Sequence, residues 1–315
     1  MSTKTTTPKK EQPRMTPALT APILVLVVYI LIAASGGLDL LSLGSEESVY
    51  LSTIAVRLLV FTVPGIFYVK LKESGYTLRL GFSPIGIGKI GFCLTVLGAL
   101  ISFSLLIRMF TGHMEASLPV IMPGLEEAAA SVGDANFLYI LVSFAIVPAV
   151  CEEFIFRAIL LTEYSEYGCP TAVITSAALY GMLAFSPADF PLLFVMGILL
   201  GMAFYTTRSV TAPLLIHFGY SAWVLFLDEK VMSLLNQPTN AIFLRFFVCL
   251  IFLGFMITLL GTSESIYYIY GTQSLATPSY YKENRKKFTG LFSVITSPAF
   301  LVCVLIFFII SMIGI

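Results

Sequence analysis

Nine long apolar stretches constrain this chain more than any other feature of its sequence. A membrane-spanning helix needs about 20 mostly apolar residues, because each residue adds about 1.5 Å and the hydrocarbon core is about 30 Å thick. Only Ala188 and Asp189 separate the fifth stretch from the sixth, which predicts a tight helical hairpin. The sequence therefore predicts an all-α fold, a polytopic transmembrane helical bundle with about nine spans. The stretches cover residues 17–35, 50–70, 88–110, 136–161, 171–187, 190–207, 210–227, 241–262 and 292–315.

The composition excludes an ordinary water-soluble protein. Only 11% of the 315 residues are charged and 57% are hydrophobic, whereas soluble domains carry about 25% charged residues. The 18 basic and 18 acidic residues cancel, so we expect membrane lipid and no nucleic acid as a partner. The five cysteines are scattered without a C-x-x-C pair, which argues against a disulfide framework or a cysteine zinc cluster.

Basic residues gather in alternate loops and thereby predict the orientation. They occur in the N-terminal tail, between residues 70 and 89, at Arg208, and in the loop at 263–290, whereas the opposite loops hold only Lys230. The positive-inside rule then places the N-terminus in the cytoplasm. Residues 1–16, rich in Thr, Lys and Pro, predict a disordered cytoplasmic tail.

Two acids and an arginine lie inside the fourth apolar stretch, where a charge costs about 2.5–3.5 kcal/mol on the insertion scale. Glu153 and Arg157 stand four residues apart, the spacing of an ion pair on one helix face. Glu152 is left over, about 100° round the helix, and an unpaired buried carboxylate suits a general base. The alternative is that all three snorkel at the cytoplasmic end. The apolar run 158–161 that follows Arg157 argues against it.

One of the two histidines lies within a span. His217 is in the seventh stretch, with Ser221 four residues later on the same face. At about 1.5 Å per residue, Glu152, Tyr180 and His217 all lie roughly 10–14 Å from the cytoplasmic edge, so the three are expected to share one layer. The alternative is that His217 is only hydrogen-bonded packing. His113 falls in an outer loop, where we expect an ordinary surface residue.

The pattern Glu152-Glu153-x-x-x-Arg157 resembles the E-E-x-x-x-R signature of the CAAX-protease and bacteriocin-processing family, the type II CAAX prenyl endopeptidases, also called Abi proteins. These are intramembrane endopeptidases that carry F-x-x-x-H on a following helix and H-x-x-x-N further on. The resemblance covers residues 136–227, under a third of the chain. The order of the motifs along successive spans adds to its specificity.

The later motifs depart from the family pattern. Tyr180 stands in place of the Phe, Ala184 in place of the second-motif His, and Ser221 in place of the Asn, while His217 is retained. Ala184 has no group that orients a water or binds a metal. A catalytic zinc site usually has three protein ligands. This layer offers one His and two Glu, but Glu153 is expected to pair with Arg157, so we expect no metal and keep zinc as the less favoured alternative.

The resemblance implies a role for each residue. Glu152 would activate water, with Glu153 and Arg157 as its support. His217 would donate to the oxyanion, with Ser221 as a weaker second donor. Tyr180 and Ala184 would line the substrate pocket.

The resemblance also implies a function and a location. The expected activity is that of an intramembrane endopeptidase acting on a membrane-associated protein or peptide, in a bacterial plasma membrane. The alternative is a catalytically dead member that binds or regulates. A transporter is disfavoured because the sequence has no inverted repeat. The predicted divisions are the tail at 1–16, N-terminal membrane helices at 17–135, a CAAX-protease-like core at 136–227, and C-terminal membrane helices with the basic loop at 228–315.

Overall fold

A computed structural model describes residues 16–35, 46–72, 85–112, 137–235, 241–272 and 287–313. Three features predicted above lie outside these residues. They are the N-terminal tail apart from Thr16, the surface residue His113, and the centre of the basic loop at 273–286.

Helices account for all the regular structure in the described ranges, which confirms the all-α prediction. The first half contains α1 (Pro17–Ser35), α2 (Glu46–Arg57), η2 (Leu58–Thr62), α3 (Val63–Lys72), η3 (Ile87–Lys89), α4 (Ile90–Thr111), α6 (Phe137–Leu141), η4 (Val142–Ile146), α7 (Val147–Glu153), η5 (Phe154–Leu160), α8 (Leu161–Tyr164) and η6 (Ser165–Tyr167). The second half contains α9 (Cys169–Gly181), η7 (Met182–Ala184), α10 (Phe190–Thr207), α11 (Thr211–Phe226), α12 (Asp228–Leu235), α13 (Ala241–Thr272), α14 (Lys287–Ile295) and α15 (Pro298–Ile313).

Each predicted apolar stretch coincides with an apolar helical segment, so the protein is an integral membrane protein. Six segments in the described ranges are long and apolar enough to cross a bilayer: Pro17–Ser35, Tyr50–Lys72, Ile87–Thr111, Phe137–Tyr167, Phe190–Thr207 and Ile242–Thr262. Three more are apolar but shorter: Cys169–Ala184, Thr211–Phe226 and Pro298–Ile313. The number of crossings and the cytoplasmic N-terminus stay predictions.

The last apolar stretch is divided where the sequence predicted one continuous span. Helix α14 ends at Ile295 and α15 begins at Pro298. Proline is tolerated at the first position of a helix, because the N–H that it lacks would have no partner within the helix there. The backbone N–H of Phe300 donates to the Ser297 hydroxyl at 3.3 Å and so caps the new helix. Hydropathy missed the break because apolar residues flank it on both sides.

The predicted helical hairpin is present between α9 and α10. These two helices are extensively packed against each other. Gly197 makes their close approach feasible, because a Cβ at this position would lie only 2.8 Å from the Cα of Ala177. The chain reverses at Phe185, which has a φ of 48°.

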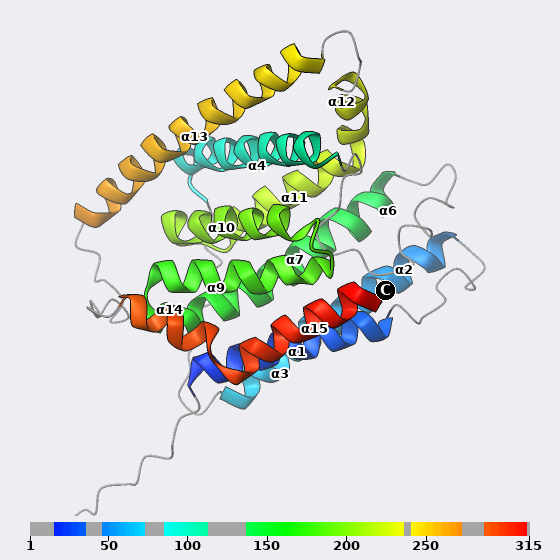
Figure 1. The fold of residues 1–315 in the computed structure, drawn as a ribbon, viewed down its shortest axis with the longest axis vertical. Helices are drawn as coiled ribbons and strands as arrows, with labels where there is room; N and C mark the ends of the chain where they lie inside the picture. The colour runs from blue at the N-terminus through cyan, green and yellow to red at the C-terminus, as the bar shows by residue number, and fades with distance from the viewer. Residues whose placement is uncertain are drawn as a thin grey trace, which may run out of the picture.

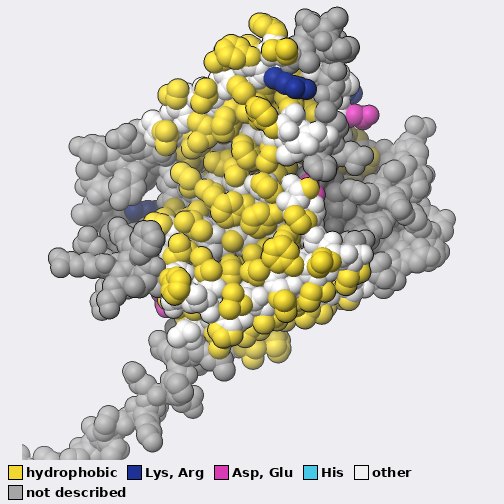
Figure 2. All heavy atoms as spheres, in the orientation of Figure 1, with side chains coloured by type: hydrophobic (Ala, Val, Ile, Leu, Met, Phe, Trp, Pro, Cys, Tyr) yellow, Lys and Arg dark blue, Asp and Glu magenta, His cyan; other side chains and the backbone are white. Residues whose placement is uncertain are grey.

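Figure 1 shows the helices lying side by side, with α13 at one edge against α4 and with α1 paired with α15 near the opposite edge. Helices α7, α9, α10 and α11 lie between these edges, so the middle of the sequence is also the middle of the bundle. Hydrophobic side chains cover most of the described surface on the face drawn in Figure 2, as expected of a surface in contact with lipid.

Contacts at the helix ends agree with the alternation of the basic loops. Lys72 at the end of α3 pairs with Glu163 in α8, and Lys89 Nζ donates to the carbonyl of Thr207 at 3.0 Å. These contacts bring together helix ends next to loops that the charge count assigns to one side. The rings of Phe137, at the start of α6, and Phe226, at the end of α11, have centroids 4.7 Å apart.

Candidate functional site

The candidate site forms where two helices change from α to π geometry. Helix α7 ends at Glu153 and continues as the π-helical segment η5, and α2 ends at Arg57 and continues as the π-helical segment η2. Such π-helical turns are rare and occur frequently at functional sites. Thr62 Oγ1 lies 3.6 Å from Cys151 Sγ, so η2 and α7 are in direct contact beside the acids.

Glu152 is fully buried and both of its carboxylate oxygens accept a hydrogen bond. Arg57 Nη1 donates to Oε1 at 2.9 Å, and the Tyr180 hydroxyl donates to Oε2 at 3.1 Å. The prediction that Glu152 lacks an ion partner was therefore wrong. The Arg57 side chain is buried as well, at only 2% exposure. A buried charge is tolerated when an opposite charge and good hydrogen bonds accompany it.

Glu153 makes the ion pair expected from its spacing and one contact that was not expected. Its Oε2 lies 3.0 Å from Arg157 Nε, and its Oε1 lies 2.9 Å from His217 Nδ1. The other imidazole nitrogen, His217 Nε2, lies 3.7 Å from Glu152 Oε2. The predicted common layer of Glu152, Tyr180 and His217 is thus present, with one imidazole between two carboxylates.

The hydrogen bond to Glu153 fixes which nitrogen of His217 carries a proton. A carboxylate oxygen at 2.9 Å accepts, so Nδ1–H donates to it. His217 Nε2 has no hydrogen-bond partner among the described residues, and the same holds for the buried hydroxyl of Ser221 one turn later. These two atoms keep their hydrogen-bonding capacity in a fully buried setting, where unsatisfied polar groups are rare.

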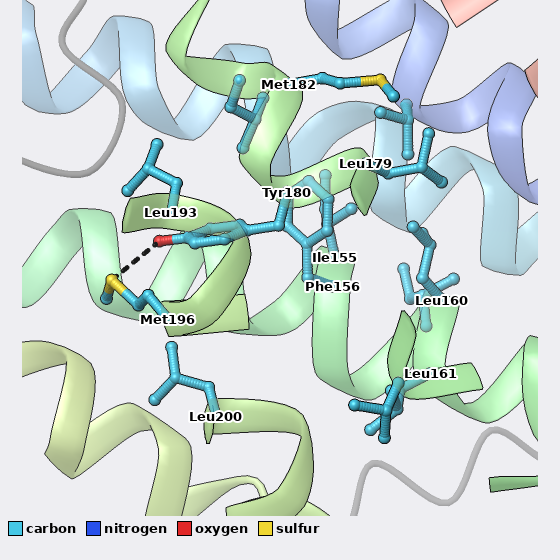
Figure 3. Close-up of a cluster of buried hydrophobic side chains, with 14 of the residues drawn as sticks. Ile155, Phe156, Leu160, Leu161, Leu179, Tyr180, Met182, Leu193, Met196 and Leu200 are labelled. Atoms are coloured by element: carbon cyan, nitrogen blue, oxygen red, sulfur yellow. Dashed lines mark hydrogen bonds between the residues drawn. The ribbon is translucent and has the colours of Figure 1, made fainter. Parts of the chain in front are cut away.

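Tyr180 forms one wall of the site. Figure 3 shows its ring among apolar side chains, including Phe156, Leu193 and Met196. Its hydroxyl points toward Met196, whose sulfur lies 3.8 Å away. The guanidinium carbon of Arg157 lies 4.6 Å from the ring centroid, a cation–π contact. Tyr180 is therefore both packed in place and a hydrogen-bond donor to the acid.

Ala184 lies after the α-helical part of the segment. Helix α9 ends at Gly181, and Ala184 closes the 3₁₀ turn η7, where it is half-buried. The ring of the next residue, Phe185, packs edge-on against the ring of Tyr29, with the two centroids 5.4 Å apart. The position that aligns with the second-motif histidine therefore offers a methyl group only.

Arg57 is the site residue that the sequence interpretation missed. Its signal was present, because an arginine in an apolar span needs an acid partner and Glu152 was the acid without one. The same reasoning does not apply to Arg245, which is exposed. Nothing in the spacing along the chain relates residue 57 to residue 152, so only the fold identifies the pair.

A second buried polar cluster lies where α4, α11 and α12 meet. Arg108 forms a two-pronged ion pair with Asp228, in which Nη1 lies 2.7 Å from Oδ2. Trp223 Nε1 donates to Asp228 Oδ1 at 3.2 Å, and the Tyr220 hydroxyl donates to Ser104 Oγ at 2.9 Å. This cluster joins the end of the helix that carries His217 to its neighbours.

The donors do not fit a zinc site. Glu152 and Glu153 each form an ion pair with an arginine, and His217 Nδ1 is engaged with Glu153. In the described part of the chain, no three His, Cys, Asp or Glu side chains are grouped so that they could hold a metal ion. A catalytic zinc usually has three protein ligands, and these donors do not supply them.

Comparison with protein families gives one match. Residues 134–223 match the Rce1-like family model, described as type II CAAX prenyl endopeptidase Rce1-like. The match covers under a third of the chain, includes every residue from Glu152 to Ser221, and leaves out Arg57. It confirms the resemblance to the CAAX-protease family. No curated protein and no solved structure matches the chain.

Proposed function

Given that residues 134–223 form an Rce1-like region, we propose that this protein is an intramembrane endopeptidase of a bacterial plasma membrane. Its substrate would be a membrane-associated protein or peptide. One observation carries the proposal: Glu152 Oε2 and His217 Nε2 face each other at 3.7 Å, and Nε2 has no hydrogen-bond partner among the described residues. A water beside both atoms would be within reach of a base and an imidazole.

The proposed reaction begins with proton transfer to Glu152. Glu152 takes a proton from water, and the resulting hydroxide attacks the carbonyl carbon of the peptide bond, whose electron pair moves onto the carbonyl oxygen. His217 Nε2 donates to that oxyanion and Ser221 is the second donor. When the carbon–nitrogen bond breaks, the proton on Glu152 passes to the leaving amine. The products are a carboxylic acid and an amine, so one water is consumed.

The hydrogen bond between His217 and Glu153 sets a condition on this scheme. Because Nδ1–H is engaged with Glu153, Nε2 donates only when the ring carries a proton on both nitrogens. Glu153 then holds the ring in place, and its ion pair with Arg157 holds Glu153. A hydrogen-bond donor that is already oriented toward the oxyanion in a site without water typically raises the rate about 10²–10³-fold.

A second candidate function rests on two specific departures. Arg57 occupies Oε1 of Glu152, and Ala184 supplies no group that could hold a water. Loss of one orienting group typically costs about 10²–10⁴ in rate. A member of this family without turnover would still bind a membrane peptide or a lipidated tail and act as a binding or regulatory protein.

Glu152→Gln separates the two functions. Cells that produce the wild-type protein or the variant are compared by mass spectrometry of the protein termini in their membranes. The matched control is Glu163→Gln, which changes another buried glutamate, paired with Lys72 outside the site. The peptidase proposal expects a set of termini that Glu152→Gln removes and Glu163→Gln keeps. Unchanged termini in Glu152→Gln, at equal protein level, would leave only the binding function.

A further inference from the structure

Arg57 connects the candidate base to a part of the chain outside the Rce1-like region. It is the last residue of α2, and it reaches Glu152 at the end of α7 with a 2.9 Å hydrogen bond. Both side chains are buried, at 2% and 0% exposure. Helix α2 also packs against α7 and η4, so Arg57 is delivered to the acid by an extended contact between helices.

The hydrogen bonds to Glu152 determine how its carboxylate is turned. Arg57 holds Oε1, and Tyr180 holds Oε2 on the side that faces His217 Nε2. The terminal torsion of a glutamate is broad, so a carboxylate without these donors would sample other orientations. Arg57 therefore contributes the direction of the carboxylate as well as its charge.

Ala184 has no polar group that could orient the Glu152 carboxylate, so other residues must do so. We propose that Arg57 is the positioning residue of the candidate base, supplying from α2 the support that residue 184 cannot give. The inference rests on the proposed function, because the position of Glu152 matters for catalysis only if Glu152 is the base. It also implies that residues 134–223 do not form a complete site without the N-terminal helices.

The ionised state of Glu152 provides a test that does not depend on turnover. A buried carboxylate that loses its ion partner takes up a proton rather than staying charged. A protonated carboxyl group has an infrared C=O stretching band that is separate from the carboxylate bands. The probe is the full-length protein in lipid bilayers near neutral pH, without any substrate.

In the infrared test, Arg57→Gln is expected to show a new carboxylic-acid band, with an intensity of about one group per chain. The band should be missing from the wild type, from Arg57→Lys, and from Arg57→Gln/Glu152→Gln. Loss of the band in the double variant assigns it to Glu152. The double variant also leaves no unpaired buried charge, because two neutral amides replace the ion pair, so it is expected to fold. Absence of the band in folded Arg57→Gln would overturn the inference.

The matched control uses a buried arginine–carboxylate pair that lies outside the candidate site. Arg108→Gln should give a band that Asp228→Asn removes and Glu152→Gln does not, because Arg108 pairs with Asp228 and not with Glu152. If Arg108→Gln instead produced a band that Glu152→Gln removed, the effect would be a general loosening of the bundle. That outcome would also overturn the assignment of Arg57.

Cleavage then tests the positioning role, with a prenylated peptide ending in a CAAX sequence as the probe. Arg57→Gln is expected to lower kcat about 10²-fold with little change in KM, because a small misplacement of a reacting group costs about that much. Arg57→Lys should recover part of the loss in kcat. If Arg57→Gln raised KM and left kcat unchanged, the positioning role would be contradicted. If Glu152→Gln leaves the membrane termini unchanged, the proposed function fails, while the infrared result still decides the ion pair.

Discussion

In the part of the bundle that the structure describes, two buried polar clusters are built from the same kinds of side chain. The outer cluster consists of Arg108, Asp228 and Trp223, with Ser104 and Tyr220 beside them. The inner cluster consists of Arg57, Glu152, Glu153, Arg157 and His217, with Tyr180 and Ser221 beside them. Each contains at least one arginine–carboxylate ion pair with almost no exposed surface.

The clusters differ in whether their hydrogen bonds are complete. In the outer cluster, both carboxylate oxygens of Asp228 accept from Arg108, and no buried side-chain atom of its members lacks a partner. In the inner cluster, His217 Nε2 and Ser221 Oγ have no partner among the described residues. A satisfied network makes a bundle rigid, whereas unsatisfied buried groups call for a further explanation, such as a substrate. The difference supports the proposal that the inner cluster takes part in chemistry, and it favours a structural role for the outer cluster.

The largest effect is expected from breaking the outer cluster. Arg108→Gln leaves the Asp228 carboxylate buried without its ion partner, and removal of one member of a buried pair typically costs about 3–5 kcal/mol. Thermal unfolding in detergent measures the loss of stability. Because the outer cluster does not contact Glu152, the cleavage rate per folded molecule should stay within a factor of about three of the wild type. A specific activity that fell with stability would remove the contrast between the clusters.

Removing the imidazole from the inner cluster should lower the cleavage rate more than the stability. His217→Gln loses the proposed oxyanion donor, so cleavage should fall about 10²–10³-fold. The measurement is the rate at which new membrane-protein termini appear. Tyr220→Phe, which removes a hydroxyl from the same helix but outside the inner cluster, is the matched control and should keep its rate. Equal losses in the two variants would indicate damage to α11 in general.

The smallest effect is expected at the second donor. Ser221→Ala removes a hydroxyl that has no partner among the described residues, so stability should change by less than about 1 kcal/mol. Cleavage should fall by about tenfold or less, because a neutral hydroxyl donates more weakly than a charged ring. A loss as large as that of His217→Gln would make Ser221 an equal partner and would sharpen the mechanism accordingly.

Local features of the site were predictable from the sequence, and long-range ones were not. The Glu153–Arg157 pair follows from a spacing of four residues on one helix. The common layer of Glu152, Tyr180 and His217 follows from counting residues along spans whose ends hydropathy locates. Arg57 could not be assigned in this way, because pairing between α2 and α7 depends on how the helices pack. The Glu153–His217 hydrogen bond was missed because the spacing along the helix assigned Glu153 to Arg157 alone.

The fold likewise has features that the sequence predicts and features that it does not. The apolar stretches predicted the helices well, because burial in lipid requires both an apolar surface and an internally hydrogen-bonded backbone. Hydropathy did not detect the break before Pro298, since Thr296 and Ser297 are too few to interrupt an apolar average. The π-helical segments η2 and η5, which end at Thr62 and Leu160, have no signature in hydropathy at all.

The central claim is that the inner cluster carries out chemistry and the outer cluster does not. It is tested most directly by the termini of membrane proteins in cells that produce Glu152→Gln or Asp228→Asn in place of the wild type. The account predicts that Glu152→Gln loses every protein-dependent terminus, while Asp228→Asn keeps them in proportion to the amount of folded protein. Retention of the termini in Glu152→Gln, or equal loss per folded molecule in both variants, would contradict it.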